Sequence, residues 1–383
     1  MDFMMSMSRS DEQKVSILVF VEDPGALNGL LPMARRLASA GHNVHVEFDG
    51  FARSAKGLDL RGFTLATGSL ENISTKKYDV LLVGTSENVN SIAFELIEKC
   101  KNFGIMTYAF IDSPANPSNR FSAGGSDPLK FAPDFLIVLD QKTARIFEHL
   151  GFSREGILVT EHPHLEWLHS QKLKFSEQSS SDIRALTFGE NYRNQTLITF
   201  CSELSSGLDN EGYKRTDEYL LESPDTIVNR SDIVMYNFLE ALDQLKHDGL
   251  SFKSILRLHP KQLAEDSPLR NRFDVISQGG DAFKVCMASS VIVGMTSMVL
   301  VEAVELDVPV ISLLPRSKEV EWMHTSIREK VPICFNFEEF LITIRRVLNA
   351  KNGSDNPNDR VIYNNLSQDY VDFIVGGKGT RAL

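Results

Sequence analysis

Cysteine is scarce in this chain of 383 residues, and its cysteines lie far apart. Cys100, Cys201, Cys286 and Cys334 form neither a CxxC pair nor a Cys/His cluster with metal-binding spacing. Isolated cysteines of this kind are typical of reduced thiols that fill the core of an intracellular protein. We therefore expect no disulfide bond and no cysteine-bound metal, and we expect a cytoplasmic location.

Long apolar segments and an excess of positive charge are missing as well. No stretch approaches about 18 consecutive apolar residues, and the opening MDFMMSMSRSDEQK is too polar for a signal peptide. With 40 basic against 51 acidic residues, the formal net charge is −11, which disfavours nucleic acid as a partner. The sequence predicts a soluble protein and leaves peripheral association with a membrane, as well as the oligomeric state, open.

Short apolar runs alternate with stretches of helical period, and this alternation occurs twice along the chain. Runs rich in Val, Ile and Leu are typical of parallel strands that helices cover on both faces. Strands are expected at 15–21, 43–48, 78–84, 105–111, 133–139 and 156–160, and again at 196–202, 252–258, 273–276, 289–294 and 309–314. Helices are expected at 26–40, 87–102, 141–150, 231–248, 297–306, 336–350 and 360–375. The pattern predicts an α/β fold with two Rossmann-like domains that face each other across a cleft.

The boundary between the two sets is marked by the polar, serine-rich stretch KFSEQSSSD. We therefore expect an N-terminal domain over 1–173, a linker over 174–195 and a C-terminal domain over 196–354. Residues 203–230 are polar and acidic, and they are expected to form a loop or lid.

Ligands of open parallel sheets bind beyond the carboxyl ends of the strands, so the residues that follow each strand are the candidates for a site. After the first strand, Glu22 and Asp23 precede Pro24 and Gly25, and Asn28 follows in the same segment. The pair is either a general base beside a turn that admits a substrate, or an ordinary helix-capping turn.

Three further strand ends of the first domain carry polar groups. Thr85 and Ser86 could receive an anion at a helix start or could simply cap that helix. Asp112 ends an apolar strand, and a Pro/Asn/Ser loop leads from it to Arg120, so both are expected to reach the cleft. Where the chain leaves the domain, Glu161, His162 and His164 lack the spacing of a metal site and are expected to pack at a hinge.

The second domain offers strand ends that suit a phosphate. The hydroxyl-rich stretch CSELSSG carries Glu203, and ILRLHPKQL places Arg257, His259 and Lys261 at the end of a strand that Pro260 terminates. We expect these basic groups to contact a phosphate. The alternative for His259 is a local hydrogen bond to a neighbouring carbonyl.

A glycine turn at Gly294 leads into a helix that Thr296 and Ser297 begin. Free N–H groups and the helix dipole at such a turn suit a diphosphate, although Thr and Ser are also ordinary helix caps. Glu302, further along the helix, could accept hydrogen bonds from a ribose.

In this order, these features resemble the GT-B glycosyltransferase superfamily. The resemblance rests on the hydroxyl-rich strand end, the His-Pro pair, the G-x-T-S turn and the following VEAVELDVPVISLLP. The pattern is most similar to the bacterial sialyltransferases, polysialyltransferases, CDP-glycerol glycerophosphotransferases and related capsule or surface-polysaccharide enzymes. The non-hydrolysing UDP-GlcNAc 2-epimerases are structural cousins of this group.

The resemblance implies roles for individual residues. His259, Thr296 and Ser297 would contact the donor phosphate, and Glu302 would bind the donor ribose. The acidic pair that supplies the base in bacterial sialyltransferases is followed directly by Gly, whereas Pro24 separates Asp23 from Gly25 here. Residues 355–383 resemble a tail whose final helix crosses back to the first domain.

We therefore expect a metal-independent transfer of a sugar or polyol phosphate from a nucleotide donor to a hydroxyl acceptor. Asp23, or else Asp112, would take the acceptor proton, while His259 with Lys261 or Arg257 stabilises the leaving phosphate. Glu22, Gly25, Asn28 and Arg120 are expected on the acceptor side, and Glu203 on the donor side. No cofactor is expected, and the sequence has no DxD-type metal motif.

Three questions stay open at the level of sequence. The donor could be CMP-, CDP- or UDP-linked, and its acceptor a glycan or a small molecule. The protein could instead act as an epimerase or hydrolase on a nucleotide sugar, with Asp112 and Glu161 as acid and base. It could also bind a nucleotide sugar without catalysis.

Overall fold

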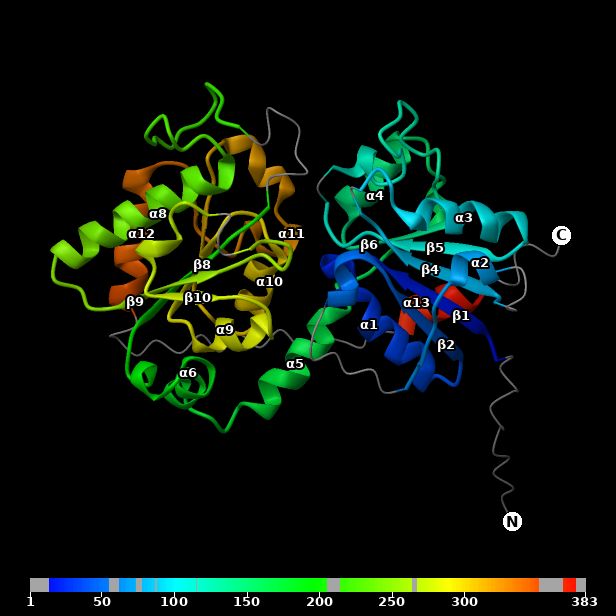
Figure 1. The fold of residues 1–383 in the computed structure, drawn as a ribbon, viewed down its shortest axis with the longest axis horizontal. Coiled ribbons are helices and arrows are strands. Elements are labelled where there is room, and N and C mark those ends of the chain that lie inside the picture. The colour runs from blue at the N-terminus through cyan, green and yellow to red at the C-terminus, as the bar shows by residue number, and fades with distance from the viewer. Residues whose placement is uncertain are drawn as a thin grey trace, which may run out of the picture.

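The computed structural model describes residues 14–54, 62–73, 78–86, 88–114, 116–204, 214–263, 267–350 and 368–376. These residues form two lobes, each built on one parallel β-sheet with helices packed around it (Figure 1). The α/β fold with two Rossmann-like domains is therefore confirmed.

The N-terminal lobe contains a sheet of seven strands in the order β3-β2-β1-β4-β5-β6-β7. The strands are β1 (Ser16–Val21), β2 (Asn43–Phe48), β3 (Thr64–Leu65), β4 (Val80–Gly84), β5 (Met106–Phe110), β6 (Phe135–Val138) and β7 (Ile157–Val159). The helices are α1 (Pro24–Ser39), α2 (Ser69–Asn72), α3 (Ile92–Asn102) and α4 (Gln141–His149), with short 3₁₀ turns at Gly50–Ser54, Pro117–Asn119 and Arg154–Gly156. The strand order reverses between β1 and β4, which pair in parallel, and such a reversal is where open α/β sheets bind ligands.

The C-terminal lobe contains a sheet of six strands in the order β10-β9-β8-β11-β12-β13. The strands are β8 (Leu197–Cys201), β9 (Lys253–Arg257), β10 (Val275–Ser277), β11 (Val291–Gly294), β12 (Val310–Leu313) and β13 (Ile333–Cys334). The helices are α8 (Arg230–His247), α9 (Ala282–Ala288), α10 (Met298–Glu305), α11 (Thr325–Arg328) and α12 (Phe337–Ala350), with 3₁₀ turns at Glu190–Tyr192, Arg270–Arg272 and Ser317–Trp322. Here the order reverses between β8 and β11, the strands that precede Glu203 and Thr296.

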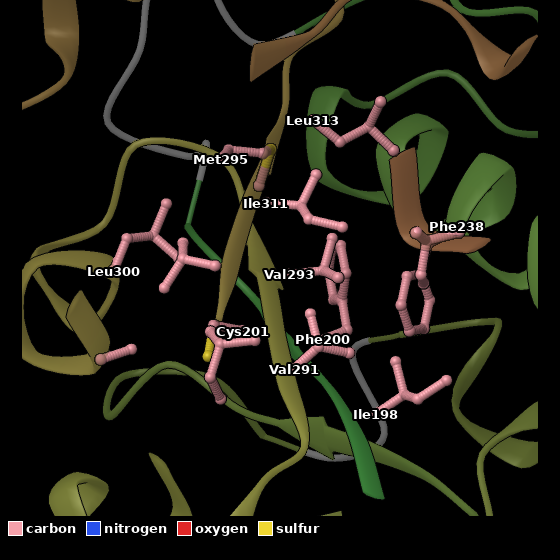
Figure 2. Close-up of a cluster of buried hydrophobic side chains, with 14 of the residues drawn as sticks. Ile198, Phe200, Cys201, Phe238, Val291, Val293, Met295, Leu300, Ile311 and Leu313 are labelled. Carbon is pink, nitrogen blue, oxygen red and sulfur yellow. The ribbon is translucent and has the colours of Figure 1, made fainter. Parts of the chain in front are cut away.

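The core of the C-terminal lobe explains why its strands read as continuous apolar runs. Both faces of the sheet are covered, so Ile198, Phe200 and Val293 are all fully buried. Figure 2 shows Phe200 and Phe238 meeting between the sheet and α8, with their ring centroids 5.1 Å apart. Cys201 is buried there as well, and burial raises the pKa of its thiol to about 12. All four cysteines are buried and free, as we expected of core thiols.

Five helices of the described residues occupy sequence that we did not predict to be helical, namely α2, α5, α6, α9 and α11. Helix α5 (His164–Lys174) lies between the lobes, and α6 (Ser180–Phe188) falls within the segment predicted as a linker (Figure 1). The serine-rich sequence starts a helix because the Ser179 side chain accepts a hydrogen bond from the Asp182 N–H at 3.1 Å and caps α6. Arg184 then donates to the Ala288 carbonyl of α9 at 3.0 Å, which fastens α6 to the C-terminal lobe.

Helix α13 (Gln368–Gly376) lies in the N-terminal lobe beside α1 (Figure 1). Tyr370, Val371 and Ile374 belong to the same apolar cluster as β1 and α1. The Tyr108 hydroxyl donates to the Phe373 carbonyl at 3.1 Å. In the predicted 355–383 tail, residues 355–367 and 377–383 lie outside the described residues. In the predicted loop or lid at 203–230, residues 205–213 lie outside them as well.

The two lobes are joined by α5 and by ion pairs. Arg36 of α1 pairs with Glu166 of α5 at 3.3 Å, and Lys172 at the other end of α5 donates to the Glu305 carbonyl of α10 at 3.0 Å. A further pair joins Lys142 to Glu321 directly. In the described part of the chain, none of the helices is long and apolar enough to cross a membrane.

Candidate functional site

The ends of β1 and β9 meet where the two lobes touch, through an ion pair between Asp23 and Lys261. Asp23 caps α1, because its Oδ1 accepts the Gly25 N–H at 3.1 Å and Pro24 occupies the first helical position. Its other carboxylate oxygen contacts the Lys261 Nζ. About a fifth of each side chain is exposed, at 19% for Asp23 and 21% for Lys261. A partly buried carboxylate from one sheet thus faces a cation from the other.

His259 stands next to this pair and is a neutral donor at pH 7. Its Nδ1 accepts the Lys261 N–H at 3.2 Å, so the neutral ring carries its proton on Nε2. Burial and the Lys261 cation lower the pKa of His259 to about 4, although the carboxylates of Asp23 and Glu203 oppose this shift. The carboxylates of Asp23 and Glu203 are therefore both near enough to His259 to influence its pKa.

The N–H groups at the start of α10 form an anion site that Glu203 fills. The Glu203 Oε1 accepts the backbone N–H groups of Thr296 and Ser297, the latter at 2.6 Å. Its Oε2 accepts the Thr296 hydroxyl at 2.9 Å. We expected this turn to bind a phosphate, and its geometry does hold a negatively charged group. That group is a carboxylate from the end of β8.

A set of buried charges that the sequence did not lead us to expect lies beside Glu203. Arg230, at the start of α8, is 1% exposed and donates to Glu203 at 3.2 Å and to Glu319 at 2.7 Å. Arg316 also donates to Glu319, at 2.7 Å. Both guanidinium groups lie over the Trp322 ring, at 5.3 and 5.6 Å from its centroid. Arg316 follows β12 closely, so inspection of that strand end would have found it.

Asp112 lies on the N-terminal side of the same region. Its Oδ1 pairs with Arg120 at 3.3 Å, and the Arg120 residue is only 5% exposed. A Cβ atom placed on Gly25 would lie 2.3 Å from the Asp112 Oδ2 and 3.7 Å from the Asp23 Oδ1. The two carboxylates that we considered as bases therefore flank Gly25, where a methyl group would displace the carboxylate of Asp112.

Other predicted site residues have structural partners elsewhere. Arg257 donates to the Ser277 hydroxyl at 3.0 Å and to the carbonyls of Gly279 and Gly280, so it fastens the loop after β10. Glu22 accepts the Ser91 hydroxyl and the Ile92 N–H at the start of α3. Both side chains are thus occupied in holding neighbouring elements.

Glu302 and the hinge histidines form a separate contact between the lobes. Glu302 is 3% exposed and lies 3.2 Å from the His164 Nε2. His164 stacks on Trp167 with ring centroids 4.9 Å apart. His162 is buried beside Phe110, and burial holds the pKa of His162 well below its usual value. This contact fits the hinge packing that we expected for the histidines.

Among the remaining candidates, Thr85 contacts a residue named above, because the Arg120 Nη1 donates to the Thr85 hydroxyl at 3.4 Å. Asn28 is exposed on α1. The Thr85 hydroxyl donates to the Phe110 carbonyl at 3.2 Å, and the Ser86 hydroxyl accepts the Asn88 N–H at 3.1 Å. The pKa of Glu161 is raised by burial and by Glu305, which places Glu161 near the far end of α10. Among the described residues, no group of His, Cys, Asp and Glu side chains is arranged to hold a metal ion.

Comparison with known proteins shows the fold but not a sequence family. No protein-family model matches the chain, and no curated protein matches it. Among solved structures, the Methanocaldococcus jannaschii UDP-GlcNAc 2-epimerase in complex with UDP-GlcNAc and UDP is similar, with a TM-score of 0.60 at 14% identity. That similarity covers 94% of this chain and 99% of the other.

Two further solved structures that are similar to this chain are not named as epimerases. Anabaena Alr3699/HepE in complex with UDP-glucose has a TM-score of 0.58 at 12% identity, over 94% of this chain and 95% of the other. The wall teichoic acid polymerase TagF has a TM-score of 0.56 at 13% identity, over 96% of this chain and 90% of the other. The chain therefore has the GT-B fold, as the resemblance in its sequence implies.

Proposed function

We propose that this protein transfers a sugar or a polyol phosphate from a nucleotide-activated donor to a hydroxyl acceptor. The observation that carries the proposal is the meeting of Asp23 with Lys261 and His259, because it combines a potential base with two donors for a leaving phosphate. These groups follow strands of two different sheets, so each lobe supplies one half of the reaction. Both sheets present their ligand-binding edge there.

The donor side uses charge and N–H groups of the C-terminal lobe. The His259 Nε2–H and the Lys261 ammonium would stabilise the negative charge that develops on the leaving phosphate. When the phosphate binds, Lys261 can exchange its Asp23 partner for the phosphate. That exchange leaves the Asp23 carboxylate free to accept the proton of the acceptor hydroxyl.

The acceptor side is formed by the N-terminal lobe. Asp23 is the proposed base, and Asp112, held by Arg120, would hydrogen-bond the acceptor hydroxyls. Phe51 is 56% exposed and lies beside Lys261. The Lys261 Nζ is 5.2 Å from the centroid of the Phe51 ring. An exposed aromatic ring next to the proposed base offers an apolar surface against which an acceptor can pack.

The names of the similar structures support a nucleotide-linked donor. Two of them contain UDP-sugars and one is a wall teichoic acid polymerase. We therefore take UDP-linked sugars as the first donors to test, together with CDP-glycerol, which the sequence resemblance suggests.

Epimerisation of a nucleotide sugar is the second candidate, because several of the similar structures are UDP-GlcNAc 2-epimerases. Its predicted acid and base are not both at this site. Asp112 flanks Gly25, whereas Glu161 interacts with Glu305, His169 and Lys330. NMR spectra of UDP-GlcNAc incubated with the protein alone separate the two, since only an epimerase produces an isomer without an acceptor.

A panel of nucleotides tests the donor half of the proposal. CMP, CDP, UDP, GDP and their sugars are added singly, and the melting temperature is measured, because a ligand that binds only the folded state raises it. We expect one nucleotide series to stabilise the wild type and to lose that effect in the His259→Ala variant. Stabilisation by none of them would contradict a nucleotide donor.

A further inference from the structure

The Glu203 carboxylate occupies the turn at Thr296 and Ser297, which the sequence led us to expect as a contact of the donor phosphate. Both backbone N–H groups of that turn, from Thr296 and Ser297, already donate to the Glu203 Oε1. The backbone of Glu203 is also anchored, because the Ser231 hydroxyl donates to its carbonyl at 2.6 Å. An incoming phosphate needs the same N–H groups and carries the same sign of charge.

This contact is not required to cap the helix. The Ser297 side chain caps α10 by accepting the Val299 N–H at 3.3 Å. The N–H groups of Thr296 and Ser297 precede the helix. They form a separate turn that donates hydrogen bonds to a negatively charged group. That turn lies at the β8–β11 reversal of the sheet, which is where a ligand is expected.

We propose that Glu203 is an internal competitor of the donor, and that the diphosphate binds only after this carboxylate has left the turn. The inference rests on the proposed function, since it identifies the competing anion as the diphosphate of a nucleotide donor. The contact is therefore autoinhibitory: it keeps the turn closed to weakly bound anions.

The departure of Glu203 would also change the partners of Arg230. It holds Glu203 at 3.2 Å and Glu319 at 2.7 Å, so the departure of Glu203 leaves it with one carboxylate partner. Counted as ionised groups, Arg230 and Arg316 balance Glu203 and Glu319, and the loss of Glu203 leaves one positive charge in excess. This excess positive charge would favour an anion in the turn that Glu203 has left.

Calorimetric titration with inorganic pyrophosphate tests the inference without a nucleotide. We expect Glu203→Ala to bind pyrophosphate at least about tenfold more tightly than the wild type, because a charged competitor of the anion has been removed. Glu203→Gln, which keeps the size of the side chain, should lie between the two. Glu222→Gln is the matched control, since it removes the same charge from an exposed side chain of the following segment.

Unchanged or weaker binding of pyrophosphate by a folded Glu203→Ala or Glu203→Gln variant would overturn the inference, since Glu203 would then assist binding or play no part in it. A UDP and CDP titration of the same variants keeps this result distinct from the proposed function. If pyrophosphate binds more tightly to Glu203→Ala but no nucleotide binds any variant, the internal competitor stands and the nucleotide donor does not.

Discussion

Asp23 of the N-terminal lobe and Lys261 of the C-terminal lobe form an ion pair across the boundary between the two sheets. Each follows the carboxyl end of a strand. The His259 ring accepts the Lys261 N–H, and the Gly25 N–H donates to the Asp23 carboxylate. The pair joins the two halves of the proposed site. Its strength therefore affects both the affinity for the donor and the freedom of the base.

Replacement of Lys261 tests the donor half of this relationship. Lys261→Met should weaken binding of the nucleotide donor by about ten- to a hundredfold, because a charge-assisted contact to phosphate contributes about 1.5–3 kcal/mol. The dissociation constant from calorimetry checks this value. Lys253→Met is the matched control, since Lys253 starts the same strand and pairs with Asp274 at 2.9 Å. Equal affinities of the two variants would contradict the role of Lys261.

Two glycines of α1 are expected to respond differently to a methyl group. Gly29→Ala places a Cβ atom 2.1 Å from the buried Phe110 ring, and such overpacking should lower the free energy of unfolding by about 1–3 kcal/mol. Gly25→Ala instead displaces the Asp112 carboxylate, which is the end of a side chain and can move. It should lower turnover with little loss of stability.

Urea unfolding and steady-state kinetics of both glycine variants check this difference. If Gly25→Ala turned over at the wild-type rate, close approach of the two carboxylates would have no part in the reaction.

How far the sequence could predict the site depended on the distance between partners along the chain. Asp23, His259 and Lys261 were found because each follows an apolar strand, and a strand end can be recognised locally. The contact of Glu203 with Thr296 was not foreseeable, because it joins residues 93 positions apart. Residue type alone therefore predicted that Glu203 would contact a ligand, but not that it would occupy the phosphate turn.

The same limit explains Arg257 and α6. A basic residue at a strand end suits a phosphate, but the carbonyls of Gly279 and Gly280 take its guanidinium in a loop whose path the sequence does not specify. In the serine-rich segment, composition indicated a loop, whereas the position of Ser179 as an N-cap began a helix. The longer strands of the two sheets were predicted because their apolar runs report burial on both faces, whereas the two-residue strands β3 and β13 were not.

The shifted pKa of His259 makes stability depend on pH. In the unfolded chain, a histidine binds a proton below about pH 6.5, whereas folded His259 stays neutral down to about pH 4. The unfolded state therefore binds more protons in this window, and the free energy of unfolding should fall as the pH falls through it. His259→Asn should make this fall less steep.

Urea titrations at several pH values between 4 and 7 measure the effect. His247→Asn serves as the control, because the His247 side chain is 87% exposed. The same pH profile for His259→Asn and the wild type would contradict the buried, neutral histidine.

The buried charges behind the site should contribute to stability. Burial disfavours the charge on Arg230, but the carboxylates of Glu319 and Glu203 outweigh it and raise its pKa above the usual value. Glu319→Gln leaves two buried guanidinium groups short of a partner, which should lower the free energy of unfolding by about 3 kcal/mol.

Glu218→Gln is the control for that variant, since the pair of Glu218 with Lys318 is exposed. It should unfold at the wild-type urea concentration. Equal stabilities of the two variants would show that the buried charges are not coupled.

Transfer of label from donor to acceptor tests the central claim most directly. Radiolabelled UDP-GlcNAc, UDP-glucose and CDP-glycerol are incubated with the protein, with and without a pool of oligosaccharides and polyol phosphates. We predict that label moves into the pool from one donor, and that Asp23→Asn lowers the rate by about 100-fold or more while Asp49→Asn, which alters the Asp49 carboxylate beyond β2, does not. Conversion of a donor into an isomer without the pool, or an unchanged rate for Asp23→Asn, would contradict the account.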